Sequence, residues 1–277
     1  MTVKDVLQSN GFVCSKRYGQ NFLTDSNLLS AIVADAGVLP TDTVLEIGAG
    51  AGTLTAALAA NAKRVVAYEI DTRLRPVLQT TLAEYDNVEI IFQDFMQADV
   101  AALRSRFAHA KVVANLPYYV TTPILMRLLE EGIGDSVTVT VQREVADRLT
   151  AAPATKDNGS ITVKINLVGR ATLCRVVGRN MFYPVPNVDS AVVRIDRIEG
   201  QHRDNHPALS SRLARVAFAM RRKTLVNNLT AGLGIPRDVA EDALRAVGLD
   251  VNVRGETLSA ARFVALADAL AARGVSE

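Results

Sequence analysis

The sequence predicts an α/β fold in which a mostly parallel, doubly wound sheet is followed by a small all-helical domain. Short runs of β-branched residues alternate with longer stretches of helical periodicity, which is the pattern of repeated βαβ units. One such run leads into a glycine-rich turn, a common ligand-binding feature of these sheets. Beyond residue 196 the chain becomes polar and then helical in pattern. We therefore expect two domains, residues 1–196 and residues 197–277.

Seven segments are expected to form strands. Five of them alternate with helical patterns and predict the parallel part of the sheet: Thr43–Ile47, Val65–Ile70, Val88–Phe92, Lys111–Asn115 and Val137–Val141. The last two, Ile161–Val168 and Val188–Ile195, are joined by a segment rich in proline and glycine rather than by a clear helix. Such a connection favours an antiparallel pair at one edge of the sheet.

The second domain is expected to begin after a polar linker that ends at Pro207. Apolar residues recur at helical spacing between Leu209 and Met220, which predicts a first helix. Two more helices are expected at Arg237–Val247 and Leu258–Ala272, each followed by a glycine that ends it.

Composition narrows the class of protein further. Of the 277 residues 49% are hydrophobic and 22% are charged, which is typical of a folded domain. The N-terminus lacks the pattern of a signal peptide, and no apolar run is long enough to cross a bilayer. Cys14 and Cys174 are isolated, which suits a reducing compartment, and His202 and His206 have no companion ligands. We expect a cytoplasmic monomer that binds neither a membrane nor a metal.

The basic residues are unevenly distributed, although the net charge of +2 does not by itself indicate a nucleic-acid-binding protein. No Asp or Glu occurs between Pro207 and Gly232. Five basic residues fall in that stretch: Arg212, Arg215, Arg221, Arg222 and Lys223. On charge alone, a solvated helix face is slightly favoured over an RNA-binding surface.

The glycine-rich turn follows the first of the five alternating strands, in the sequence VLEIGAGAGT from Val44 to Thr53. Glycines allow the tight turn and leave room for a ligand lying across the backbone. A dinucleotide site would have a third glycine where Thr53 stands. The observed order, an acid followed by three glycines at alternate positions, is instead typical of enzymes that use S-adenosylmethionine. A structural tight turn is the alternative.

Acidic residues end the next two strands. Glu69 lies 21 residues after Gly48, close to the spacing of an acid that accepts hydrogen bonds from both hydroxyls of a ribose. The nearby Asp71 falls past the strand end and is expected to cap the following helix. Asp94 ends the third strand, where it can accept from an adenine amine. Each acid alone fits a turn or a cap equally well, but their positions at successive strand ends favour a ligand site.

The fourth strand ends in Asn115-Leu116-Pro117-Tyr118, a form of the motif found in enzymes that methylate exocyclic amines. The lone pair of an adenine amine is delocalised into the ring, so the amine is a poor nucleophile. The side-chain oxygen of Asn115 and the backbone carbonyl of Pro117 are expected to accept its N–H bonds and to aim the lone pair at the methyl group. The ring of Tyr118 is expected to stack on the base. An ordinary β-turn is the alternative.

With these motifs in order, the chain resembles the small-subunit ribosomal RNA adenine dimethyltransferases over nearly its whole length. The resemblance rests on the glycine turn, the two acids and the Asn-Leu-Pro-Tyr motif, together with Lys16 to Leu23, Thr122-Pro123, Gln142 to Val145, Phe182 to Val193 and Arg221 to Leu225. Minor departures are Tyr18 and Ala49, which stand where Phe and Pro are more common, and the stretch 156–160, which lacks a Tyr before its glycine.

The resemblance implies a Rossmann-like class I methyltransferase sheet and S-adenosylmethionine as the cofactor. It places cofactor contacts on Asn21, Leu23, Gly48, Gly50, Glu69, Asp94 and Asn115. It also places Phe182 on the target base opposite Tyr118, and Arg221, Arg222 and Lys223 on RNA. The implied substrate is two adjacent adenosines near the 3′ end of small-subunit rRNA, each dimethylated within a pre-ribosomal particle.

Three other functions remain open. A large-subunit rRNA adenine methylase of the antibiotic-resistance type shares the fold, the cofactor and the Asn-Leu-Pro-Tyr motif. Two features argue against it by family likeness: the Pro-x-Pro-x-Val-Asp-Ser-Ala-Val-Val segment, and Arg-Arg-Lys-Thr-Leu followed by a full helical tail. A binding protein for ribosome assembly or transcription is disfavoured as the sole role, because the motifs for catalysis are intact. A DNA adenine methylase would more often carry Asp-Pro-Pro-Tyr.

Overall fold

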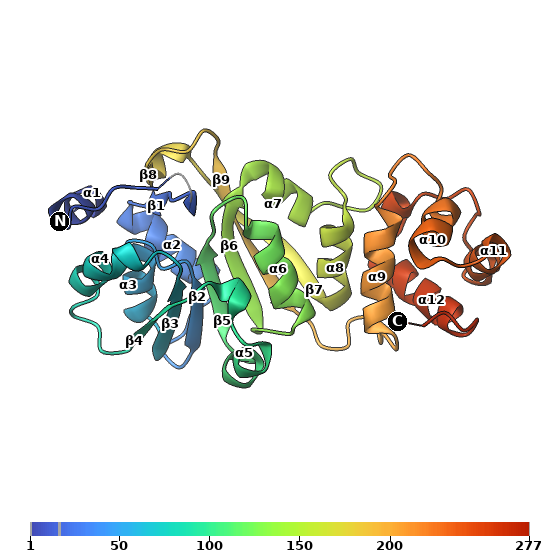
Figure 1. Ribbon diagram of the computed structural model, residues 1–277, viewed down its shortest axis with the longest axis horizontal. Coiled ribbons are helices and arrows are strands. Elements are labelled where there is room, and N and C mark those ends of the chain that lie inside the picture. Colours follow the sequence, from blue (N-terminus) through green and yellow to red (C-terminus); the bar gives the residue numbers. More distant parts are fainter. Residues whose placement is uncertain (1, 16–17, 277) are drawn as a thin grey trace. The chain divides into compact units, whose positions relative to one another are not determined.

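The computed structural model describes residues 2–15 and 18–276 and divides into two compact units (Figure 1). The first unit contains residues 1–146 and 172–196, and the second contains residues 147–171 and 197–277. The sequence-based division assigned residues 147–171 to the first domain, whereas the structure groups them with the helices that follow residue 197. No helix in the described part of the chain is long and apolar enough to cross a membrane.

A seven-stranded sheet forms the centre of the first unit, with the strand order β4-β3-β2-β5-β6-β9-β7. Its strands are β2 (Thr43–Ile47), β3 (Arg64–Glu69), β4 (Val88–Phe92), β5 (Lys111–Asn115), β6 (Ser136–Gln142), β7 (Gly169–Val177) and β9 (Ser190–Arg197). The five strands β2 to β6 run parallel, and β9 pairs antiparallel with β6. The order reverses between β2 and β5, and ligands bind at such a reversal, beyond the carboxyl ends of the strands.

The valine-rich sequences of these strands explain why both faces of the sheet are covered. Val44 and Val65 are register partners, and both are fully buried in one cluster with helices α2 (Ser26–Asp35) and α3 (Thr53–Ala59). On the same face, two residues along β3, Ala67 packs in a cluster with α1 (Val3–Ser9) and α4 (Arg75–Thr81). Val66 lies between them and points to the opposite face, where it is also fully buried. The remaining helices of this region are α5 (Val100–Phe107), α6 (Thr121–Glu130) and α7 (Arg143–Leu149).

A separate two-stranded ladder brings the N-terminal segment to the segment before β9. Strand β1 (Phe22–Leu23) pairs antiparallel with β8 (Phe182–Tyr183), so that Leu23 lies opposite Phe182. The hydroxyl of Thr24 extends the connection by donating to the carbonyl of Met181 at 3.1 Å. This ladder fixes residues 21–24 beside the sheet, immediately before α2.

The second unit is a bundle of five helices around its own apolar core. Its helices are α8 (Ser160–Val168), α9 (Pro207–Ala217), α10 (Leu225–Leu233), α11 (Arg237–Ala246) and α12 (Ala260–Ala271). Fully buried residues such as Leu213, Leu229 and Phe263 form one cluster with Val163 of α8. The core therefore recruits a helix from well before the linker, which is why residues 147–171 belong to this unit.

The predicted elements are largely confirmed, but one predicted strand is wrong, the strands β1, β7 and β8 were not predicted, and one helix was missed. Ile161–Val168 forms α8 instead of a strand, because its alternating apolar residues are buried in a helical bundle whose packing outweighs β propensity. Strand β9 instead pairs antiparallel with β6 and has β7 as its other neighbour, at the edge of the sheet. Helix α10 was not anticipated. Helix α9 ends at Ala217, so Arg222 lies beyond it and not on one of its faces.

Candidate active site

The predicted cofactor residues converge on one pocket at the carboxyl ends of β2, β3, β4 and β5. About 1080 Å³ of space between the lining residues, the open mouth included, is free of protein atoms. All seven predicted contacts line it: Asn21, Leu23, Gly48, Gly50, Glu69, Asp94 and Asn115. Leu116, Pro117 and Tyr118 line it as well. Lys16 and Arg17, which belong to the N-terminal motif, lie outside the described residues.

The glycine turn between β2 and α3 requires its glycines. Gly48, Gly50 and Gly52 have φ values of +85°, +57° and +83°, in the left-handed region that side chains disfavour. A Cβ on Gly50 would also lie 3.0 Å from the ring of Phe22. Gly52 is the N-cap of α3, and the backbone N–H groups of Gly48, Gly50 and Gly52 donate to Tyr68, Glu69 and Ala49, which holds the turn in shape.

Glu69 is held rigidly at the end of β3. Its two carboxylate oxygens accept the backbone N–H groups of Gly50 and Asp71, both at 2.8 Å, and only 6% of the residue is exposed. Burial raises the pKa of this carboxyl, and the two backbone hydrogen bonds oppose the rise. Each carboxylate oxygen has a second lone pair, so the pair still matches two neighbouring hydroxyl donors of a ribose.

Asp71 has the capping role expected of it. Its carboxylate accepts the backbone N–H of Arg73 at 3.2 Å and the side-chain amide of Gln20 at 2.9 Å, and it forms an ion pair with the Arg73 guanidinium. Burial opposes its ionisation, but the hydrogen bonds from Arg73 and Gln20 outweigh burial and lower the pKa of Asp71. The Gln20 bond ties the N-terminal segment to the same side of the pocket.

Asp94 lies in a loop that a single arginine fixes in place. Its carboxylate accepts the backbone N–H of Met96 at 2.9 Å and caps the short helix that follows β4. Arg127 of α6 donates to the carbonyls of Phe95 (at 2.9 Å), Met96 and Ala98, and its guanidinium lies 5.5 Å from the Phe95 ring centroid. The loop that carries Asp94 and lines the pocket is therefore clamped from outside.

The side-chain amide of Asn115 is held in one orientation by a hydrogen bond. Its amide nitrogen donates to the backbone carbonyl of Asn21 at 2.9 Å. Because a carbonyl can only accept, this bond fixes the amide so that its oxygen is left for another donor. The residue is half-buried in the pocket wall. An N-terminal residue and the end of β5 thus position one side-chain oxygen together.

The structure does not support the role expected of the Pro117 carbonyl. This oxygen already accepts the backbone N–H of Val120 at 3.1 Å and the hydroxyl of Thr121 at 3.2 Å. Both of its lone pairs are used to start helix α6, so it is not available to a substrate amine. The ring of Tyr118 does line the pocket, and its hydroxyl is hydrogen-bonded to Ser190 of β9 at 3.0 Å.

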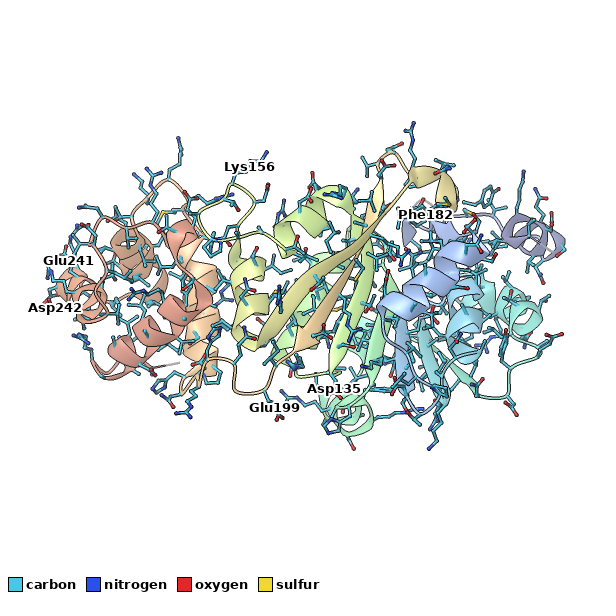
Figure 2. The ribbon with its side chains drawn as sticks, turned by 180° about the vertical axis from the view of Figure 1, so that it is seen from behind. Asp135, Lys156, Phe182, Glu199, Glu241 and Asp242 are labelled. Carbon is cyan, nitrogen blue, oxygen red and sulfur yellow. The ribbon has the colours of Figure 1, made fainter. Side chains whose placement is uncertain are left out.

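Phe182 is not placed opposite Tyr118. Only 3% of Phe182, which is labelled in Figure 2, is exposed, and it packs in the apolar cluster with Leu23 and Val177. It is not among the residues that line the pocket. Its pairing with Leu23 in the two-stranded ladder turns it towards the core, so the structure does not show the aromatic sandwich that the resemblance implied.

Glu46, the acid of the glycine motif, is a pocket residue that was not among the predicted cofactor contacts. It is fully buried in β2, and within the described part of the chain neither carboxylate oxygen accepts a hydrogen bond. Burial raises its pKa to about 8, with Thr55 lowering it and Glu69 adding to the rise. An acid inside the otherwise apolar sequence VLEI was the signal that could have identified it.

The unpartnered carboxyl of Glu46 allows a test of whether S-adenosylmethionine fits. That cofactor carries an ammonium and a sulfonium, and a buried acceptor without a partner is complementary to positive charge. With Glu69 and Asp94 the pocket presents three acids in a row along β2, β3 and β4. The acidic residues of the pocket therefore fit the cofactor.

Replacing Glu46 with glutamine is expected to remove a pH dependence of stability. The folded state keeps the proton up to about pH 8, whereas the unfolded state releases it near 4.5. The free energy of unfolding should therefore fall as pH rises between these values, by at most about 5 kcal/mol. Urea unfolding is measured at several pH values across this range. The free energy of unfolding should change less with pH for Glu46→Gln than for the wild type or for an exposed control, Glu84→Gln. Equal changes with pH would contradict a proton held by Glu46.

The predicted RNA-binding residues lie together in the second unit, between α9 and α10, and all three are exposed. Arg221 is partly neutralised, because its guanidinium lies 3.3 Å from the carboxylate of Glu256 and donates to the carbonyl of Lys156 at 2.8 Å (Lys156 is labelled in Figure 2). Among the described residues no ion pair involves Arg222 or Lys223. These two remain open to a phosphate ligand.

The fold and the pocket together define a class of protein. A parallel sheet with a glycine turn after β2, an acid at the end of β3 and an Asn-Leu-Pro-Tyr motif after β5 is the architecture of an S-adenosylmethionine-dependent methyltransferase that modifies exocyclic amines. The profile of the family described as "Ribosomal RNA adenine dimethylase" matches residues 11–272. The chain belongs to this family.

Individual relatives agree with this assignment. The chain is 46% identical to a protein of Geobacillus thermodenitrificans, covering 96% of this chain and 94% of the relative, and 44% identical to one of Listeria innocua over the same shares. Both are named "Ribosomal RNA small subunit methyltransferase A". A dimethyladenosine transferase from Plasmodium falciparum shares the fold, with a TM-score of 0.78 at 24% identity over 92% of this chain and 98% of that one. The 23S rRNA methyltransferase ErmE has a TM-score of 0.65 at 27% identity, covering 91% of this chain and 100% of its own.

Proposed function

We propose that this methyltransferase dimethylates two adjacent adenosines near the 3′ end of small-subunit rRNA, acting as a cytoplasmic monomer on a pre-ribosomal particle. The names of the relatives at 43–46% identity support the small subunit as the substrate. The observation that carries the chemistry is the fixed amide of Asn115, whose oxygen is the acceptor presented at the pocket.

Binding and orientation of the cofactor fall to the strand ends. S-adenosylmethionine, when bound, supplies a methyl group that is already activated on a sulfonium. Glu69 would accept from the ribose hydroxyls, Asp94 would accept from the adenine amine, and Glu46 would present a buried carboxyl acceptor in the interior of the pocket. The backbone of Gly48 and Gly50 allows close approach, since neither residue has a Cβ in the way.

Asn115 and its neighbours prepare the target amine. The oxygen of Asn115 accepts one N–H bond of the amine, which localises the nitrogen lone pair and directs it at the methyl group. A second acceptor must come from elsewhere than Pro117, and the main-chain carbonyl of the adjacent Leu116, which is buried and lines the pocket, is our candidate. Tyr118, tied through its hydroxyl to Ser190, supplies a ring on which the base stacks. Catalysis then consists mainly of positioning and electrostatics.

The helical unit supplies phosphate contacts in this proposal. Arg222 and Lys223 are exposed basic residues in the segment between α9 and α10. Lysine and arginine contacts to phosphate confer affinity and orientation without sequence preference. The unit would therefore hold the RNA, while the pocket selects the amine.

Reversing the charges of Arg222 and Lys223 to glutamate is expected to weaken RNA binding and to reduce its dependence on salt. Each lost phosphate contact should lower the slope of log affinity against log salt by about 1. A matched control is Arg245→Glu, because Arg245 lies in the same unit but is already paired with Glu241 and Asp242. Binding titrations at several salt concentrations give the slopes. If the slope of log affinity against log salt is the same in the double variant as in the wild type, these residues do not contact phosphate and form only a solvated surface.

The proposal is tested by identifying the product. Small subunits that lack the modification are incubated with the protein and S-adenosylmethionine, and the rRNA is digested to nucleosides and mapped. We expect N6,N6-dimethyladenosine at two adjacent positions near the 3′ end. Monomethyladenosine alone, or methyl groups elsewhere in the rRNA, would contradict the proposed reaction while leaving the family assignment intact.

A further inference from the structure

Tyr119, which follows the Asn-Leu-Pro-Tyr motif, is exposed in a way that neither the fold nor the mechanism above explains. It lines the mouth of the pocket, yet 61% of it is exposed. Among the described residues it is the only aromatic residue in the exposed class. Burying an aromatic ring of this size is favourable, so a ring left in water at the edge of an active site calls for a ligand.

The ring of Tyr119 is held in place by the N-terminal segment. A Cβ on Gly19 would lie 3.3 Å from Cε1 and 3.4 Å from Cδ1 of this ring, so a side chain at residue 19 would press against it. Gly19 also has a φ of +55°, which favours glycine. The ring is thus packed on one side and open to solvent elsewhere, which is the arrangement of a stacking platform.

The two consecutive tyrosines point to different environments. Tyr118 is half-buried and its hydroxyl is bonded to Ser190, whereas Tyr119 is exposed. If Tyr118 stacks on the adenine inside the pocket, the ring at the mouth lies next along the path of the RNA strand. A base that enters such a pocket must leave the stack of bases in the RNA, so the next base along the strand loses a stacking partner.

We propose that Tyr119 is a stacking subsite for the nucleobase adjacent to the target adenosine. The proposal rests on the proposed function, in which the neighbour of one target is the second adenosine of the pair. Tyr119 replaces the stacking partner that the flipped base removes and holds the second adenosine at the pocket mouth. Any base can stack on this ring, so the subsite contributes affinity and register without reading the base.

Two substitutions separate stacking from a structural role. Tyr119→Phe keeps a flat aromatic face, and Tyr119→Leu keeps an apolar contact with Gly19 but has no such face. We expect the phenylalanine variant to match the wild type, and the leucine variant to bind RNA at least about tenfold more weakly. The affinity of both variants for S-adenosylhomocysteine should be unchanged. Leu39→Ala, at an exposed apolar position that does not line the pocket, is the matched surface control.

The direct readout is binding of short single-stranded RNA with two adjacent adenines, measured with the whole protein and S-adenosylhomocysteine. Removing the base beside the target should weaken RNA binding by the wild type about as much as Tyr119→Leu weakens binding of the complete RNA. The leucine variant should then bind the abasic RNA only slightly more weakly than it binds the complete RNA. With 2-aminopurine at that position, fluorescence should be quenched by the wild type and the phenylalanine variant but not by the leucine variant.

Several results would overturn this subsite. They are additive effects of the abasic RNA and Tyr119→Leu, a phenylalanine variant as weak as the leucine variant, or a leucine variant that has lost cofactor affinity. Failure of the proposed function is distinguished because it appears in the wild type, as methyl transfer to the wrong RNA. The binding cycle on adenine-containing RNA is independent of that result.

Discussion

Substituting Asn115 with alanine is expected to lower the rate of methyl transfer by at least about a hundredfold while leaving the fold and the affinity for RNA nearly unchanged. The loss follows from removing the oxygen that accepts the amine N–H, since deleting one such polar contact in a preorganised site costs about 10²–10³ in rate. The alanine also removes the hydrogen bond to the carbonyl of Asn21. Single-turnover transfer on saturating RNA and cofactor measures the rate of the chemical step.

A matched control for this variant is Asn61→Ala. Asn61 is exposed and donates a similar side-chain hydrogen bond to a backbone carbonyl, that of Ala57 at 2.9 Å, but it does not line the pocket. We expect this control to transfer methyl groups at the wild-type rate. If Asn115→Ala also does so, the assignment of Asn115 as the acceptor is wrong. If both variants lose thermal stability equally and only Asn115→Ala loses activity, the assignment stands.

Substituting Glu69 with alanine is expected to weaken cofactor binding by about a hundredfold or more, with RNA binding unaffected. Two hydrogen bonds to a carboxylate are lost, and each contributes about 1.5–3 kcal/mol. The substitution also releases the N–H groups of Gly50 and Asp71, so part of the effect comes from loosening the glycine turn. Calorimetric titration with S-adenosylhomocysteine gives the affinity.

A cofactor analogue separates the ribose contact from the loosened turn. An S-adenosylhomocysteine that lacks one ribose hydroxyl should bind the wild type more weakly than the complete molecule does. In Glu69→Ala the two ligands should bind equally, because the acceptor is gone. If Glu69→Ala still binds the ligand without the hydroxyl more weakly than the complete ligand, Glu69 does not bind the ribose. Burial raises the pKa of Glu69, so this carboxylate takes up a proton at a higher pH than an ordinary glutamate does. As the solution is acidified, the affinity of the wild type for the cofactor should therefore begin to fall at that higher pH.

The sequence predicted the parallel part of the fold well because its signals are local. Strands β2, β4 and β5 begin and end at the expected residues, since each is a short apolar run bounded by turns. The cofactor residues at their ends also converge as expected, because parallel strands present their carboxyl ends at one edge. Positions that follow directly from strand topology were therefore predictable.

The predictions were wrong where tertiary packing determines the local structure. The alternating apolar residues from Ile161 to Val168 suit a strand, but they pack into a helical core formed mostly by residues beyond 207. Phe182 lies in the core because its register opposite Leu23 turns it inward, and no local pattern reveals that register. The Pro117 carbonyl is used by Val120 and Thr121 to start α6, a detail that only the backbone geometry shows.

The central claim is tested most directly by methyl transfer from radiolabelled S-adenosylmethionine to separated small and large ribosomal subunits that lack the modification, with Asn115→Ala measured in parallel. We predict label in small-subunit rRNA, recovered as dimethyladenosine, with none above background for the variant. Label in large-subunit rRNA instead, or equal label from the wild type and the Asn115→Ala variant, would contradict the account.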